Sequence, residues 1–160
     1  MTIAHTVRNY LEQQRVPFEV VTHSHTGSSL RTADQAEISP GRLAKAVLLE
    51  DDLEHSHYLM AVVPATHRVQ LGELSRRAGR PVHLATEEDA VGLFADCEAG
   101  AIPPLGPAYG VETIWEDSLM EQPDLYFEAG DHEHLVHLNS ADFARLLPDC
   151  PHGPISRARP

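Results

Sequence analysis

Positive charge is scarce in this sequence, and lysine is almost absent. The 160 residues include 12 lysines and arginines against 24 aspartates and glutamates, which gives a formal net charge of -12. Affinity for a nucleic-acid backbone comes mainly from lysine and arginine, so the composition excludes broad, non-specific nucleic-acid binding. Any contact with nucleic acid must therefore be local. The acidic excess also suits a salt-adapted proteome, and the sequence leaves that alternative open.

A disulfide framework and a membrane-spanning segment are also missing. Cys97 and Cys150 are the only cysteines, and they lie far apart without CxxC spacing. This pattern suits a reducing compartment. No apolar run approaches the ~18 residues of a membrane span, and the N-terminal residues lack the pattern of a secretory signal. We therefore expect a cytoplasmic protein that has no membrane partner.

Several motifs of known enzyme classes are absent as well. Without GxSxG, a P-loop or GxGxxG, the sequence gives no support for a serine hydrolase, nucleotide hydrolysis or dinucleotide chemistry. Zinc needs three or four converging ligands, and there is no HExxH, so we predict neither a metal nor a cofactor. Cys97 lacks an evident basic partner and is predicted to be a small buried residue. Histidine is abundant, with 11 residues, and three pairs are two apart: His23 with His25, His55 with His57, and His132 with His134.

Hydrophobic periodicity and turn residues predict one α/β (α+β) domain over residues 1–147. We expect a mixed β-sheet or partly closed barrel surrounded by helices. Pro151, Gly153 and Pro154 favour a loose C-terminal tail over residues 148–160. Helices are expected at about 2–15, from Thr32, at 69–78, from Thr86 and at 140–147, and strands at 18–21, 45–50, 57–65, 81–85, 110–115, 125–128 and 134–138, with residues 97–107 irregular.

Lys45 is the only lysine in the chain, and it opens an apolar run that is typical of a buried strand. Lysine is almost never buried unless it is paired or functional, so we expect it at the mouth of that strand, facing a cavity. Its compact ammonium can hold one oxyanion, a task for which arginine is not equivalent. A codon bias towards arginine is the alternative explanation.

Two further segments can contribute to a site. The segment 100–106 combines prolines with glycines that let a ligand approach backbone N–H groups, as an oxyanion site requires, although an ordinary turn is the alternative. In the Gly130-Asp131-His132 turn, His132 is either a turn residue or one that positions water. Arginine is densest at Arg76, Arg77 and Arg80. This group is either a solvated helix face or a contact for a few phosphates. Arg42, close to Lys45 in the sequence, could also contact a few phosphates.

These segments together resemble a known family, the YbaK-type aminoacyl-tRNA deacylases, or prolyl-tRNA editing domains. The resemblance rests on Lys45 at the head of its strand, on the GxxxP motif from Gly100 to Pro104, and on the GxH turn within 127–132. It extends from about residue 16 to residue 147. The sequence Gly-Ala-Ile-Pro-Pro is most similar to the branch that removes alanine from tRNA for proline, whereas other branches clear cysteine, serine or threonine.

The resemblance implies a free-standing hydrolase that cleaves the ester of mischarged aminoacyl-tRNA in trans, with Ala-tRNA(Pro) as the expected substrate. Lys45 would hold a phosphate or the ester oxygen. A synthetase or an elongation factor is a further possible partner. The alternative is a non-catalytic module of the same fold that binds tRNA ends or a small ligand. The implied catalytic residues are Lys45, Gly100 and His132, and the implied substrate-binding residues are His25, Ala101, Ile102, Pro103, Pro104 and Gly130.

Overall fold

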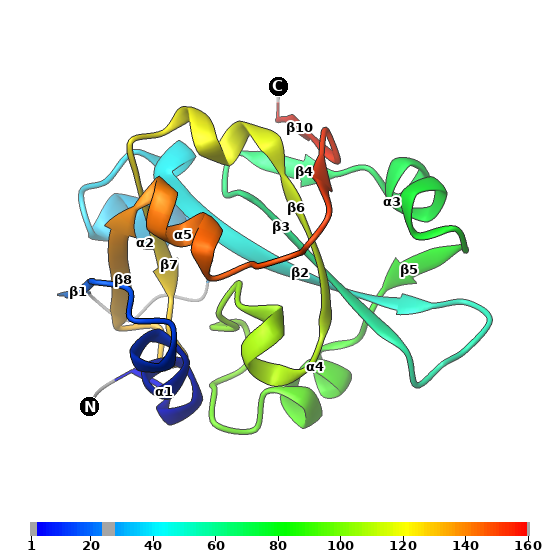
Figure 1. Ribbon diagram of the computed structural model, residues 1–160, viewed down its shortest axis with the longest axis horizontal. Coiled ribbons are helices and arrows are strands. Elements are labelled where there is room, and N and C mark those ends of the chain that lie inside the picture. The colour runs from blue at the N-terminus through cyan, green and yellow to red at the C-terminus, as the bar shows by residue number, and fades with distance from the viewer. Residues whose placement is uncertain (1–2, 24–27, 160) are drawn as a thin grey trace.

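The computed structural model of the protein describes residues 3–23 and 28–159 (Figure 1). The helices are α1 (His5–Gln13), α2 (Ser29–Gln35), α3 (Leu71–Ala78), α4 (Glu87–Leu93) and α5 (Ser140–Arg145), and short 3-10 turns are η1 (Pro40–Arg42), η2 (Gly106–Tyr109) and η3 (Asp117–Glu121). The strands are β1 (Glu19–Thr22), β2 (Leu43–Asp51), β3 (Tyr58–Pro64), β4 (His67–Val69), β5 (Val82–Leu84), β6 (Glu112–Glu116), β7 (Asp124–Glu128), β8 (His134–Asn139), β9 (His152–Gly153) and β10 (Ser156–Ala158).

Most of these strands form one mixed sheet. Within the described residues it has 8 strands in the order β1-β8-β7-β2-β3-β6-β9, and β5 pairs with the end of β2. The β2–β7, β3–β6 and β6–β9 pairs are parallel, and the other pairs of this sheet are antiparallel. β4 and β10 form a separate two-stranded sheet. The prediction of a mixed α/β architecture is confirmed.

Helices cover both faces of the sheet, and the alternation along β3 shows how. Met60 and Val62 point to the face where α1, α4 and α5 add their apolar side chains. Leu59 and Ala61 point to the other face, together with Leu74 of α3. Figure 1 shows α1 and α5 beside the β7–β8 end of the sheet and α3 at the opposite end. Because both faces are covered, the central strands read as continuous apolar runs in the sequence.

Some helix boundaries differ from the predicted ones because an earlier residue provides the cap. Helix α2 begins one turn before the expected start, since the Ser28 hydroxyl accepts the N–H of Arg31 at 3.2 Å. Helix α5 begins at Ser140 as predicted, with Asn139 as its cap, whose side chain accepts the N–H of Asp142 at 2.8 Å; it ends at Arg145, before the predicted end. The predicted start of α4 is confirmed, with Thr86 as its N-cap.

The prediction of a loose C-terminal tail is wrong. β9 pairs with β6, and β10 pairs with β4. Between them Ile155 is fully buried, with 0% of its surface exposed. One carboxylate oxygen of the buried Glu116 accepts the backbone N–H groups of Ile155 and Ser156, each at 3.0 Å. Proline and glycine in this tail therefore exclude a helix, but they do not prevent short strands that are fixed by distant residues.

The buried position of Ile155 gives a test of this anchoring. Replacing Ile155 by alanine is expected to lower the free energy of unfolding by about 2–5 kcal/mol, because the change leaves a cavity in the core. Chemical denaturation followed by circular dichroism measures the loss. Replacing the neighbouring Pro154, which is exposed, by alanine is the matched control and should change stability little. Equal stability of the two variants would contradict the packed tail.

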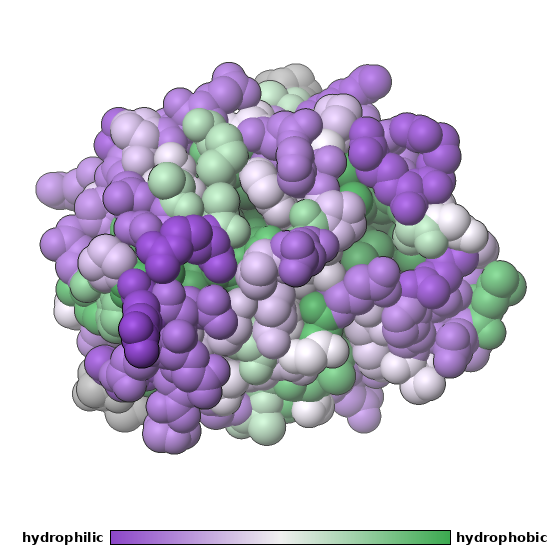
Figure 2. Space-filling model, in the orientation of Figure 1, coloured by the Kyte–Doolittle hydropathy of each residue, from purple (hydrophilic) through white to green (hydrophobic). Residues whose placement is uncertain are grey.

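The surface in Figure 2 is mostly hydrophilic, and an isolated hydrophobic group lies at one end of the view, over the hairpin between β2 and β3. Leu53 belongs to that hairpin and is 78% exposed. No helix in the described part of the chain combines the length and the apolar character needed to cross a bilayer.

Candidate functional site

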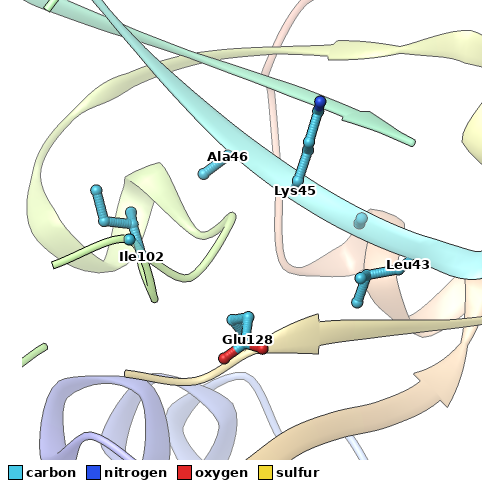
Figure 3. A pocket seen from close by; sticks show the side chains of 7 residues that line it. Leu43, Lys45, Ala46, Ile102 and Glu128 are labelled. Atoms are coloured by element: carbon cyan, nitrogen blue, oxygen red, sulfur yellow. The ribbon is translucent and has the colours of Figure 1, made fainter. Parts of the chain in front are cut away.

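A small pocket lies where the beginning of β2, the loop after α4 and the end of β7 meet (Figure 3). Its volume is about 80 Å³. This is well below the volume of typical drug-sized ligand sites but enough for several waters or a small organic group. The structure therefore brings Lys45 together with two residues of the predicted glycine-proline loop. The pocket is lined by Leu43, Ala44, Lys45, Ala46, Gly100, Ile102 and Glu128.

Two backbone N–H groups of the loop, at residues that line the pocket, have no hydrogen-bond partner among the described residues. Pro103 and Pro104 have no N–H, and the Ala101 N–H donates to the Glu98 carbonyl at 3.1 Å. Gly100 and Ile102 line the pocket, and their N–H groups have no acceptor within the described ranges. Gly100 has φ +81°, and a Cβ here would lie 3.3 Å from Cε1 of His132. Glycine is therefore needed at this position for both its backbone conformation and its close contact.

The other predicted loop residues do not line the pocket. Ala101, Pro103 and Pro104 are buried, so they stabilise the shape of the loop. Gly130 has a similar role: its carbonyl accepts the Glu98 N–H at 2.7 Å. A Cβ on Gly130 would lie 2.9 Å from Cβ of Ala4 in the segment before α1. Direct substrate contact was predicted for all four, and their placement instead indicates that they position Gly100 and Ile102.

His132 lies behind the loop. Its ring is buried, and Nε2 lies 2.6 Å from the carbonyl oxygen of Ala99. A carbonyl only accepts, so Nε2 carries the proton and donates it to Ala99. His132 is not among the lining residues of the pocket. The prediction that it positions a water does not fit this geometry, because the donor is already used to fix the loop.

Among the predicted substrate-binding histidines, His25 lies outside the described residues. His23 is described and buried, at the end of β1. Its Nε2 lies 3.4 Å from Oε1 of Glu128. His23 therefore contacts a residue that lines the pocket, Glu128, and is not itself a lining residue.

Glu128 is the pocket residue that sequence reasoning missed. It is the last residue of β7, is only 7% exposed and lines the pocket. Burial raises the pKa of Glu128 to about 7, although the nearby His132 and a hydrogen bond from Thr32 oppose the rise. The available signal in the sequence was an acidic residue at the end of an apolar strand, directly before the glycine-histidine turn.

Lys45 is half-buried, and its ammonium points away from Glu128, on the opposite side of β2 in Figure 3. Burial, together with the positive charges of Arg159 and Arg68, lowers the pKa of Lys45 to about 8. A positive charge held among other positive charges is suited to bind an anion. The carboxyl group of Glu128 thus lies on one side of β2 and the ammonium of Lys45 lies on the other (Figure 3).

The four arginines singled out in the sequence are all paired with acids. Arg76 and Arg77 both contact Glu73 on the same helix. Arg80 Nε lies 3.0 Å from Asp51, and Arg42 lies 3.2 Å from Asp124. These contacts favour the interpretation of a solvated, ion-paired surface over that of a phosphate contact. The charge of these arginines is therefore largely compensated within the protein.

A cluster of metal-ligand residue types and a cysteine lie outside the pocket. Asp51, Glu54 and His57 have ligand atoms within 4.8 Å of one another, but Asp51 already forms an ion pair with Arg80. Cys97 is partly buried next to Tyr109, and burial raises its pKa to about 12. A thiol with such a pKa is protonated at neutral pH and is a poor nucleophile.

Comparison with known proteins identifies the family. The model of the family described as "Aminoacyl-tRNA editing domain" matches residues 23–146. No curated protein matches the sequence significantly. Among solved structures, the hypothetical protein APE2540 is 17% identical with a TM-score of 0.83, over 96% of this chain and 100% of that chain.

A second solved structure, described as "a putative trans-editing enzyme for prolyl tRNA synthetase", is 19% identical with a TM-score of 0.79. The alignment covers 96% of each chain. At these identities the two structures establish a shared fold. The family model covers most of the chain, including β2, the pocket loop and the glycine-histidine turn. The chain therefore belongs to the aminoacyl-tRNA editing domain family.

Proposed function

We propose that the protein is a trans-editing deacylase that hydrolyses the ester of mischarged aminoacyl-tRNA, with Ala-tRNA(Pro) as its substrate. The observation that carries the proposal is the small pocket in which Lys45, the Gly100–Ile102 loop and Glu128 meet. The family assignment and the likeness to a structure described as a trans-editing enzyme support it.

An aminoacyl ester is an activated acyl group, so its hydrolysis needs orientation and charge stabilisation more than an unusual nucleophile. The N–H groups of Gly100 and Ile102 are available to stabilise the oxyanion that forms when water attacks the ester carbonyl. The bond between the carbonyl carbon and the ribose oxygen then breaks, and the ribose oxygen takes up the proton that the attacking water gives up, so that free alanine and a ribose hydroxyl result. Lys45, on the other side of β2, binds the phosphate of the terminal nucleotide.

Glu128 gives the pocket a group that recognises an amino acid. Its carboxylate is buried at one wall, where Ile102 and Leu43 supply apolar surface. A carboxylate in this position pairs with the α-ammonium of the aminoacyl group, and the apolar surface receives a small side chain. Such charge-assisted contacts are stronger than neutral hydrogen bonds.

The size of the pocket supports alanine over proline. A synthetic site for proline cannot reject a smaller apolar amino acid by more than about 1–3 kcal/mol, so a second site that accepts only the smaller group is useful. At about 80 Å³, this pocket suits a methyl side chain. Proline adds a ring that would have to displace Ile102 or Leu43.

A panel of charged tRNAs tests the proposal. Purified protein is incubated with tRNA(Pro) that carries alanine, cysteine, serine or proline, and the release of free amino acid is followed over time. We expect turnover of Ala-tRNA(Pro) at least about tenfold faster than that of Pro-tRNA(Pro), as a size difference of one ring predicts. Binding of the charged tRNAs without release would instead identify a non-catalytic module that recognises tRNA ends.

A further inference from the structure

Three arginines lie on one face of the two-stranded sheet formed by β4 and β10. The strand register places Arg157 directly opposite Arg68, so their side chains share a face. Arg159 lies two residues beyond Arg157 and continues on the same face. Its backbone N–H donates to the Thr66 carbonyl at 2.9 Å, which fixes the end of the chain beside β4. All three side chains are exposed. We call Arg68, Arg157 and Arg159 the arginine face.

The arginine face lies next to Lys45. Lys45 pairs with Val63 near the end of β3, and the chain passes from there directly into β4. The charges of Arg159 and Arg68 both act on the ammonium of Lys45. This ammonium also points away from Glu128 (Figure 3). Four cationic side chains therefore lie in one region of the protein, Lys45 on β2 and the arginine face beside it.

The pairing of these four cations differs from that of the other arginines in the part of the chain that the structure describes. Within the described ranges, no ion pair joins Lys45 or a member of the arginine face to an aspartate or glutamate. The chain has 24 aspartates and glutamates, so the absence of such pairs is not caused by a lack of acids. The carboxylate of Glu116, which lies beneath β10, accepts backbone N–H groups instead of pairing with an arginine of this face. Like charges placed opposite each other across two strands destabilise the pair. By contrast, several other arginines have acidic partners: Arg42, Arg76, Arg77, Arg80 and Arg145.

We propose that Lys45 and the arginine face bind consecutive backbone phosphates at the 3′ end of the tRNA, while the aminoacyl group enters the pocket beside Glu128. This inference rests on the proposed function. The 3′ end of an aminoacyl-tRNA carries negative phosphates and ends in the positive α-ammonium of the amino acid. The protein has the complementary charges, positive at Lys45 and the arginine face and negative at Glu128. The acidic remainder of the protein repels phosphates, and it would confine the strand to this path.

The experiment compares two double variants that remove the same charge. Arg68→Gln/Arg159→Gln changes the arginine face, and Arg76→Gln/Arg145→Gln changes two exposed arginines that have acidic partners. Binding of uncharged tRNA(Pro) is measured between 50 and 200 mM salt, about the range over which phosphate contacts are lost. Hydrolysis is measured with alanyl-tRNA(Pro) and with alanyl-adenosine, which lacks phosphates.

Loss of two contacts to single-stranded RNA is expected to reduce the slope of log affinity against log salt by about 1.4 in the arginine-face variant. The ratio of kcat/KM for alanyl-tRNA(Pro) to that for alanyl-adenosine should fall about tenfold at the lowest salt. The control variant should keep both values. Equal slopes and equal ratios in the two variants would overturn the role of the arginine face. If the wild-type protein hydrolyses neither substrate, the proposed function fails, and the slopes for uncharged tRNA still decide on the arginine face.

Discussion

Replacing Lys45 by alanine is expected to lower kcat/KM for Ala-tRNA(Pro) by about 10- to 100-fold, because a contact between two charged groups, here the ammonium and a substrate phosphate, contributes about 1.5–3 kcal/mol. The ammonium is held beside the pocket without an acidic partner in the described residues, so a bound phosphate is its natural counter-ion. Release of free alanine from charged tRNA, measured under single-turnover conditions, gives the rate.

Stability separates this role from a structural one. Lys45 is partly desolvated and is repelled by Arg159 and Arg68, so removing its charge should leave the melting temperature unchanged or raise it. Lys45→Met keeps the apolar stem and removes only the charge, and it should lose as much activity as Lys45→Ala. If either variant keeps wild-type turnover, the assigned role of Lys45 is wrong.

The pH profile gives a second measure of the same group. Because the pKa of Lys45 is lowered to about 8, its charge is present below pH 8 and is lost above it. Wild-type kcat/KM, corrected for spontaneous ester hydrolysis, should therefore fall above about pH 8. Lys45→Arg stays charged throughout, so its kcat/KM should fall less steeply than that of the wild type, and the part of the fall that remains comes from loss of the substrate's α-ammonium.

The central strands could be predicted from the sequence because local patterns specify them, whereas the meeting of Lys45 with the Gly100–Pro104 loop was expected only from the resemblance to a family. The apolar runs that became β2 and β3 are long and bounded by turn residues. Gly100 requires positive φ, which its residue type already suggested. Each of these signals lies within a few residues of the feature that it predicts.

The missed features depend on contacts between distant segments. β9 and β10 have only two and three residues, and they are held by β6 and β4 together with Glu116. Pairing across such a separation leaves no periodicity in a short strand. The arginine face follows from that pairing, so the sequence could not show that Arg68 and Arg157 lie opposite each other.

The environment of Glu128 is also non-local. Its burial results from the way α2, β1 and the glycine-histidine turn close around the end of β7. The groups that face it come from all of these segments: Thr32, His23, Asp131 and His132. The same surroundings fix the hydrogen bond of His132 to Ala99, which is why a role in positioning water looked reasonable in the sequence but does not fit the structure.

Replacing Glu128 by glutamine is expected to lower kcat/KM for Ala-tRNA(Pro) by about 10- to 100-fold, because a hydrogen bond to a charged group contributes about 1.5–3 kcal/mol. Glutamine has nearly the same shape, so the pocket is preserved while the charge that pairs with the α-ammonium is lost. With N-acetyl-alanyl-tRNA(Pro), which has no ammonium, the wild type should lose most of its advantage over the variant. Equal losses on both substrates would contradict ammonium recognition.

Stability provides an independent readout of the same carboxyl group, and its sign follows from the raised pKa. In the folded protein the pKa of Glu128 is about 7, above the value of 4.5 for an exposed glutamate, so the folded state holds the proton more tightly between these values. The free energy of unfolding contributed by Glu128 is therefore greatest below pH 4.5 and is lost as pH rises to about 7. Above pH 7 the ionised group destabilises the fold, and Glu128→Gln should then be more stable than the wild type, by up to roughly 3 kcal/mol at about 1.36 kcal/mol per pH unit. Denaturation at pH 8 should show this gain in the free energy of unfolding. If Glu128→Gln is instead less stable than the wild type at pH 8, the carboxylate is paired within the protein and is not available for a cationic substrate.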